Sequence, residues 1–335
     1  MVAGPGLFGF QHWCVDPDAA RPGCLPGGPC RRGEVEVKVL VFGATGDQGE
    51  AQLRRLIAAG HTPIAVARDP SKLGVAGVDS VAADYRDPDS LARALDGVDA
   101  LFITMPSTSF QAADPLIRAV EAIGKAAARQ GLRMAVFNSS MIIKDEKRGF
   151  AAHDARWEMR ERLRDSGVPT VSIQPVIYLD NLLRAWARQH ILEENRIFYP
   201  HHPDLDVCWI CQDDVSDLMI AALDRPSLAG RAYNVGGVEG IRGPDLARRL
   251  GAVLGRPLRF DPRPIPDFCE AMAGVFKDVT TLDRDRLTGE LRRIYEWYNF
   301  GEEKPFSVDM APILADLPVA LTRLEDWAAR QDWHI

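Results

Sequence analysis

Short apolar runs alternate along this chain with segments of helical spacing. From Val37 onward, runs rich in β-branched residues predict strands over 38–42, 63–67, 78–83, 100–104, 134–138 and 170–174. Apolar residues at helical spacing predict helices between them, over 50–59, 87–95, 112–130 and 153–166. Strands that alternate with helices are typical of a parallel sheet covered on both faces. With right-handed crossovers, this pattern predicts a Rossmann-like, doubly wound α/β fold.

The alternation weakens after Pro175, where helices are expected over 214–223, 243–255 and 321–333 and short strands over 231–235 and 258–260. We therefore divide the chain into a Rossmann core over 36–180 and a smaller, mainly helical lobe over 181–335. Some segments of that lobe are expected to return to the core. Residues 1–35 are crowded with Gly, Pro and Cys, which predicts a flexible N-terminal extension.

The amino-acid composition argues against several classes of binding partner. The 335 residues carry a net charge of −7, which argues against a nucleic-acid surface or an anionic membrane as partner. No apolar run reaches the roughly 20 residues of a membrane-spanning helix. The six cysteines are too few for a disulfide scaffold in a chain of this length, so we expect a reducing, cytoplasmic compartment. A monomer or homodimer that takes a small molecule is the expected form.

Two local patterns invite a metal or redox interpretation. Cys208 and Cys211 have C-x-x-C spacing, but no second such pair accompanies them, and a buried structural pair is the favoured interpretation. His201 and His202 have no partners at ligand spacing. The sequence predicts no metal site.

A glycine-rich turn directly follows the first strand. It reads G-x-x-G-x-x-G and consists of Gly43, Ala44, Thr45, Gly46, Asp47, Gln48 and Gly49. Gly43 permits a tight turn, Gly46 lets the backbone approach a pyrophosphate, and Gly49 lets the following helix pack closely. The free N–H groups at that helix start favour an anion. Because a strand precedes the turn and a helix follows it, the pattern predicts dinucleotide binding.

The end of the second strand indicates which dinucleotide binds. An acidic residue there would bond a ribose 2′-hydroxyl, whereas arginine accommodates a 2′-phosphate. This strand is followed by Arg68, with Lys72 close behind, and both cations suit a phosphate. The intervening Asp69 could instead pair with Arg68 or face the ribose. The sequence therefore favours NADP(H) over NAD(H).

These segments resemble the NmrA-like, atypical branch of the short-chain dehydrogenase/reductase superfamily. The resemblance rests on the glycine turn, on Ala67-Arg68-Asp69-Pro70-Ser71-Lys72, on Ala83-Asp84-Tyr85 and on Phe137-Asn138-Ser139-Ser140. It implies cofactor contacts at the carboxyl ends of the strands, from the adenine to the nicotinamide: Asp84, Tyr85, Thr104, Met105, Pro106, Ser139, Ser140, Pro175, Val176, Ile177 and Tyr178.

The sequence departs from the superfamily at its usual acid–base pair, Tyr-x-x-x-Lys. Ala152 stands at the tyrosine position and Arg156 at the lysine position. Arginine can hold ribose hydroxyls but is a poor acid or base. The catalytic candidates are Arg156, His153, for which a surface or helix-capping position is the favoured alternative, and Tyr178, which could equally be core packing.

Two functions compete. The first is an NAD(P)H-dependent oxidoreductase that reduces a quinone, an enone or a similar conjugated carbonyl, with Trp157, Tyr178 and Phe198 as an apolar wall for a flat or aromatic substrate. The second is a non-catalytic NADP(H) sensor that binds a protein partner. A benzylic ether reductase or sugar-nucleotide isomerase is disfavoured, because those relatives generally retain the lysine.

Overall fold

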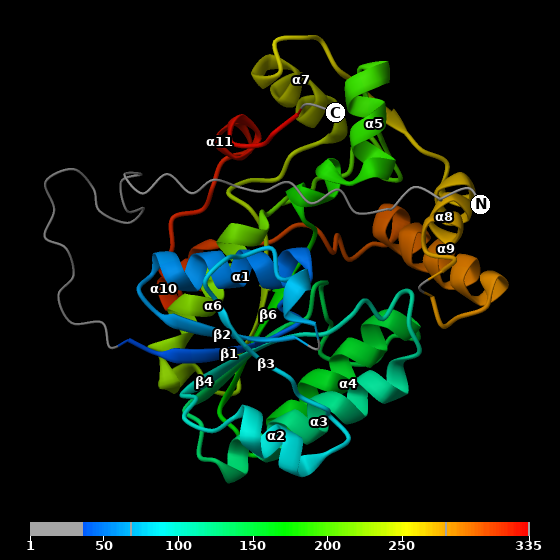
Figure 1. Cartoon of the computed structure of the whole chain (residues 1–335). Coiled ribbons are helices and arrows are strands. Elements are labelled where there is room, and N and C mark those ends of the chain that lie inside the picture. Colours follow the sequence, from blue (N-terminus) through cyan, green and yellow to red (C-terminus); the bar gives the residue numbers. More distant parts are fainter. Residues whose placement is uncertain (1–35, 68, 279, 334–335) are drawn as a thin grey trace, which may run out of the picture.

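The computed structural model describes residues 36–67, 69–278 and 280–333. The N-terminal extension expected over 1–35 lies outside these ranges, as does Arg68. Figure 1 shows a layered core with a second group of helices above one edge of its sheet.

The core is a seven-stranded sheet in the order β3-β2-β1-β4-β5-β6-β8, with every neighbouring pair parallel. Its strands are β1 Lys38–Phe42, β2 Thr62–Val66, β3 Asp79–Val81, β4 Ala100–Thr104, β5 Met134–Asn138, β6 Thr170–Pro175 and β8 Ala232–Val235. The order reverses between β1 and β4, and a doubly wound sheet binds its ligand at such a point. The fold predicted from the alternating pattern is confirmed.

Helices cover both faces of the sheet (Figure 1). One face carries α1 Asp47–Ala58 and α6 Gln212–Leu223, and the other carries α2 Pro88–Ala94, α3 Ala113–Arg129 and α4 Ala151–Asp165. The pleat of β1 explains the division, because Val39 and Val41 pack into one core while Leu40 and Phe42 pack into the other. Strands buried on both faces read as continuous apolar runs.

The C-terminal lobe contains a two-stranded parallel sheet of β7 Arg196–Tyr199 and β9 Arg259–Pro262. Its remaining elements are η2 Leu179–Leu183, α5 Ala185–Glu194, α7 Gly243–Val253, α8 Ile265–Val275, α9 Arg284–Phe300 and α11 Leu324–Ala329. Three later segments return to the core: α6, β8 and α10 Ala311–Asp316. Two short 3₁₀ turns complete the chain, η1 Pro70–Lys72 and η3 Pro226–Leu228.

Several element boundaries differ from the sequence prediction. Helix α1 begins at Asp47 rather than at residue 50, because Gly46 already acts as its extended N-cap. The last helix is shorter than the expected 321–333. Its start is displaced because the Thr322 backbone N–H donates to the Asp214 carboxylate at 2.8 Å. Strand β7 was missed, since it has only four residues and begins with an arginine, which is too short a pattern to indicate a strand.

Candidate functional site

The glycine turn packs tightly at two points and is open at a third. Gly43 has a φ of +81°, and a Cβ there would lie 2.4 Å from the Thr104 carbonyl oxygen. A Cβ on Gly49 would lie 2.2 Å from the Gly43 carbonyl oxygen. At Gly46 the nearest atom to an added Cβ is 3.6 Å away, and Gly46 is exposed together with Thr45 and Asp47. Two glycines therefore shape the turn, and the third leaves its outer side clear.

Helix α1 presents free backbone donors at this turn. Its N-cap is Gly46, and within the described part of the chain no side chain caps the first turn of the helix. The first N–H groups of a helix lack partners within it, and the helix dipole adds a partial positive charge. The clear outer side of Gly46 and these uncapped donors fit the pyrophosphate of a dinucleotide.

Gln48 connects the glycine turn to the ends of β5 and β6. Its Oε1 accepts from Asn138 Nδ2 at 2.9 Å and from Ser140 Oγ at 3.0 Å, and lies 3.0 Å from the Tyr178 hydroxyl. Ser140 has a φ of +61°, an uncommon backbone conformation for a residue other than glycine or asparagine. Such strain is typical of functional sites.

The serine and threonine expected beside the cofactor have inward partners. Ser139 is fully buried, and its hydroxyl donates to the Met141 carbonyl at 2.6 Å. The Thr104 hydroxyl accepts from Gln52 Nε2 at 2.9 Å. Both hydroxyls therefore form hydrogen bonds within the protein at the strand ends. Their contact with a cofactor stays a prediction.

Arg156 is fully buried in α4 and binds the loop that follows β4. Its Nη2 donates to the carbonyls of Met105 at 3.0 Å and Pro106 at 2.7 Å. Among the described residues no carboxylate pairs with it, and its Nε has no hydrogen-bond partner. Burial lowers the pKa of Arg156 to about 10, so the side chain keeps its charge at neutral pH. Arg156 thus orients the backbone at which the sequence places the nicotinamide ribose.

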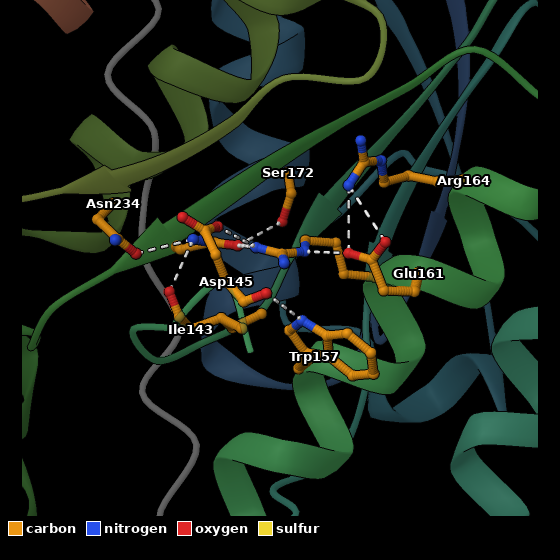
Figure 2. Close-up of polar contacts among 9 residues, drawn as sticks. Ile143, Asp145, Trp157, Glu161, Arg164, Ser172 and Asn234 are labelled. Carbon is orange, nitrogen blue, oxygen red and sulfur yellow. Dashed lines mark hydrogen bonds and ion pairs between the residues drawn. The ribbon is translucent and has the colours of Figure 1, made fainter. Parts of the chain in front are cut away.

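A buried polar network fixes the helix that carries Arg156 (Figure 2). One turn further on, Arg160 donates to Gln174 Oε1 at 3.1 Å, and Gln174 Nε2 donates to Asn234 Oδ1 at 2.7 Å. Trp157 Nε1 donates to the Asp145 carbonyl at 3.1 Å. These contacts tie α4 to β6, β8 and the loop after β5, which sets the position of its first turn.

His153 lies in an aromatic cluster rather than at the surface. It is 5% exposed, its Nε2 lies 2.7 Å from the Tyr298 hydroxyl, and its ring contacts Phe150 and Trp297. Burial, together with the nearby charges of Lys144 and Arg156, lowers the pKa of His153 to about 3. The surface or helix-capping position is therefore wrong, because α9 covers this side of α4. A neutral, enclosed imidazole is also poorly suited to supply a proton.

Ala152 lines a small pocket between three segments of the chain. The pocket encloses about 50 Å³ and is bounded by the loop after β4, the first turn of α4 and one side of α9. The Thr108 hydroxyl donates to the Ala152 carbonyl at 3.0 Å, and both residues line the pocket. The rest of the wall is mixed, with aliphatic Leu282, Leu291 and Ile294 beside polar Ser109, Gln111, Arg286 and Glu290. Ala152, which the resemblance to the superfamily places at the tyrosine position, contributes only a methyl group to this wall.

At the expected adenine end, the acidic residue after β2 is held by a residue of the following 3₁₀ turn. The Asp69 carboxylate accepts from the backbone N–H and the hydroxyl of Ser71, at 3.1 and 2.7 Å. Lys72 is exposed. Asp84 forms a two-point contact with Arg86, which lowers the pKa of this carboxyl to about 2.

Tyr85 packs its ring 6.1 Å from that of Phe42, so it lies at the end of β1. Pro175 and Ile177 are buried at the end of β6, where the Ile177 carbonyl accepts from the Ile210 N–H. The three aromatic residues expected to form a wall are separated. Trp157 packs in the core beneath α4, Tyr178 lies in the opposite core, and Phe198 contacts Arg196 and His190 in the lobe.

The sequence interpretation missed Arg184, Asn138 and Thr108. Arg184 lies between η2 and α5 and forms an ion pair with Asp47 of the glycine turn. No local pattern marks it, because its partner belongs to the other half of the chain. Asn138 could have been selected as the polar last residue of β5, since ligand-binding groups gather at the carboxyl ends of such strands.

In the part of the chain that the structure describes, the remaining motifs form neither a cluster of metal-ligating side chains nor a disulfide. No cluster of three or more metal-ligating side chains occurs among residues 36–67, 69–278 and 280–333. Cys208 and Cys211 are buried free thiols, and burial raises the pKa of each. Within the same ranges, no helix combines the length and the apolar character needed to cross a bilayer.

Comparison with known proteins identifies a family and relatives to which this chain is similar. The model of the NmrA-like family matches residues 36–325. A (4-alkanoyl-5-oxo-2,5-dihydrofuran-3-yl)methyl phosphate reductase of Streptomyces griseus is 35% identical over 226 residues, which cover 67% of this chain and 76% of that protein.

Two solved structures share the fold. The NADPH-dependent quinone oxidoreductase of Escherichia coli, solved with NADPH, matches with a TM-score of 0.67 at 20% identity, over 87% of this chain and 98% of its own. NmrA, a negative transcriptional regulator solved with NAD, matches with a TM-score of 0.66 at 16% identity, over 89% and 99%. The extent of the family match and the identity to the Streptomyces reductase show that this chain belongs to the NmrA-like family.

Proposed function

We propose that this protein is an NADP(H)-dependent oxidoreductase that reduces a conjugated carbonyl compound, such as a quinone or an enone. The observation that carries the proposal is the pocket beside Ala152, which adjoins the loop held by Arg156 at the carboxyl end of β4. NADP(H) is the cofactor, held at the glycine turn between β1 and α1. When bound, it supplies a hydride.

Each residue of the site has a binding or positioning role. The uncapped start of α1 receives the pyrophosphate, and Gly46 leaves room for it. Arg156 orients the Met105 and Pro106 carbonyls on the nicotinamide side. The aliphatic side of α9 covers the acceptor and excludes water from part of the pocket.

Conjugated acceptors suit a site that lacks the tyrosine–lysine pair. A hydride added to such an acceptor gives a delocalised enolate or hydroquinone anion, which takes its proton from water and needs little acid catalysis. An isolated ketone would give a localised alkoxide that requires a nearby donor. The Streptomyces relative supports this class, since its name describes a ring double bond conjugated with two carbonyl groups.

The test is NADPH oxidation with matched acceptors. Purified protein is mixed with NADPH and a quinone, an acyl-butenolide, an enone or the corresponding saturated ketone, and the loss of NADPH absorbance is followed. Turnover with conjugated acceptors and none with saturated ketones supports the proposal. Tight NADPH binding without turnover of any conjugated acceptor contradicts it.

A control variant locates the acceptor. Ala152→Phe fills the pocket with a ring that has no hydroxyl, so it is expected to raise the KM for the acceptor about tenfold while NADPH affinity stays unchanged. Thr108→Val removes the hydrogen bond to the Ala152 carbonyl without filling the pocket and serves as the matched comparison.

A non-catalytic NADP(H) sensor is the second candidate, and the enclosure of His153 and Arg156 favours it. Neither side chain is placed to move a proton, which suits a protein that only binds the cofactor. The fold is shared with a negative transcriptional regulator. A sensor must bind the oxidised and reduced cofactors with different affinity. Equal dissociation constants for NADP⁺ and NADPH would contradict the sensor.

A further inference from the structure

Two consecutive residues of the glycine turn are held by the segment that leads into the C-terminal lobe. Gln48 contacts the Tyr178 hydroxyl at 3.0 Å, and the Asp47 carboxylate forms an ion pair with the Arg184 guanidinium. The segment between Tyr178 and Arg184 includes the 3₁₀ turn η2. The lobe thus places one cation directly at the phosphate-binding turn.

The position of Asp47 makes this cation significant. Asp47 is the first residue of α1 and lies at the uncapped helix start, where a dinucleotide places its pyrophosphate. A carboxylate there repels the phosphates unless a cation neutralises it. Arg184 is the cation that contacts Asp47 among the described residues.

The Arg184 side chain retains capacity for a ligand. A guanidinium has five N–H donors in a planar fork, and the contact with Asp47 involves Nη2. Within the described ranges, no second acceptor contacts this guanidinium. The side chains of Arg184 and Asp47 are 47% and 52% exposed, so the pair borders open space at the turn.

We propose that Arg184 is a cofactor-binding residue of the C-terminal lobe, whose guanidinium binds the pyrophosphate of NADP(H) and is held ready over the start of α1 by Asp47. The inference rests on the NADP(H) binding proposed above. It assigns to the lobe a direct part in holding the cofactor, in addition to covering the acceptor. Arginine suits this role, because its fork matches two phosphate oxygens.

The test is a titration of Arg184→Met with NADP⁺, NAD⁺ and adenosine 2′-monophosphate, followed by protein fluorescence or calorimetry without any acceptor. The loss of a phosphate contact is expected to weaken NADP⁺ and NAD⁺ binding equally, by about tenfold or more. Adenosine 2′-monophosphate has no pyrophosphate, so its affinity is expected to stay within about twofold. A loss confined to NADP⁺ would place Arg184 at the 2′-phosphate and overturn the proposal.

The double variant Asp47→Asn/Arg184→Met separates direct binding from neutralisation. If Arg184 binds the pyrophosphate, the double variant binds NADP⁺ about tenfold more weakly than Asp47→Asn alone. If Arg184 only neutralises Asp47, removal of the carboxylate restores the affinity, and the proposal is wrong. Asp47→Asn alone is expected to bind NADP⁺ at least as tightly as the wild type.

Two further variants serve as controls for the loss of charge and for misfolding. Arg188 lies one turn further along α5 and donates to the Asp332 carbonyl, so Arg188→Met is the matched control and is expected to change affinity less than twofold. Arg184→Lys keeps the charge without the fork and is expected to bind with intermediate affinity, even if the methionine variant does not fold. Wild-type affinity in both Arg184 variants overturns this inference alone, whereas no NADP⁺ binding by the wild type overturns the proposed function as well.

Discussion

The Tyr178 hydroxyl lies 3.0 Å from Gln48 Oε1 and 3.3 Å from Asn138 Oδ1, and this joins the end of β6 to the glycine turn and the end of β5. Burial raises the pKa of Tyr178 well above its usual value, so the phenol stays protonated at physiological pH. Its proton is shared with two amide oxygens. The geometry favours a positioning role for Tyr178 over a catalytic one.

Tyr178→Phe tests that role. Loss of one net hydrogen bond is expected to lower the free energy of unfolding by about 1 kcal/mol and to weaken NADP⁺ binding severalfold, because Gln48 loses an anchor. Urea denaturation and cofactor titration measure the two effects, and kcat for a quinone is expected to stay within about twofold. A hundredfold loss of kcat would instead make Tyr178 a proton donor.

Alanine at Gly49 is expected to change stability, whereas alanine at Gly46 is expected to change cofactor affinity. A Cβ at Gly49 collides with the Gly43 carbonyl, so Gly49→Ala should lower the free energy of unfolding by about 1–3 kcal/mol. A Cβ at Gly46 meets no atom closer than 3.6 Å, so Gly46→Ala should fold normally but bind NADP⁺ at least tenfold more weakly. Thermal unfolding with and without NADP⁺ measures both. Normal cofactor affinity in Gly46→Ala would contradict the placement of the pyrophosphate.

Arg156→Met removes the donor that serves the Met105 and Pro106 carbonyls. We expect a loss of about 2–3 kcal/mol in the free energy of unfolding, since both carbonyls lose their charged partner. Arg156→Lys keeps the charge and should recover part of the loss. If both variants denature at the wild-type urea concentration, Arg156 does not hold this loop.

Two buried histidines make stability dependent on pH. The pKa values of His153 and His201 are lowered from 6.5 to about 3, mainly by burial. As the pH falls below 6.5, both histidines therefore become protonated in the unfolded chain but stay neutral in the folded protein. The free energy of unfolding is therefore highest above pH 6.5 and falls below it. The fall is about 1.5 kcal/mol for each histidine between pH 6.5 and 5.

His201→Phe isolates one of these contributions. Among the described residues, neither ring nitrogen of His201 has a hydrogen-bond partner, and its ring packs against Tyr199, Trp209 and Phe306. Phenylalanine fits this surrounding without a titrating group. The variant is expected to lose less stability than the wild type between pH 6.5 and 5, as measured by urea denaturation at each pH. An unchanged pH dependence would show that His201 is protonated in the folded state.

Features that depend on neighbours along the chain could be predicted from the sequence. The apolar run of β1, the glycine turn and the start of α1 lie within about twenty residues, so periodicity and turn chemistry predict them together. The absence of the tyrosine–lysine pair is likewise read directly from Ala152 and Arg156.

The partners and the burial of those residues depend on segments that lie far apart in the sequence. His153 meets Tyr298 from a position 145 residues away, Arg156 reaches back 50 residues to Pro106, and Arg184 approaches Asp47 from the other lobe. Local propensity carries no information on such pairs, because burial and partner are set by the packing of distant elements. The sequence therefore predicts where the cofactor binds, whereas the packing of α9 and η2 determines the burial and the partners of His153 and Arg184.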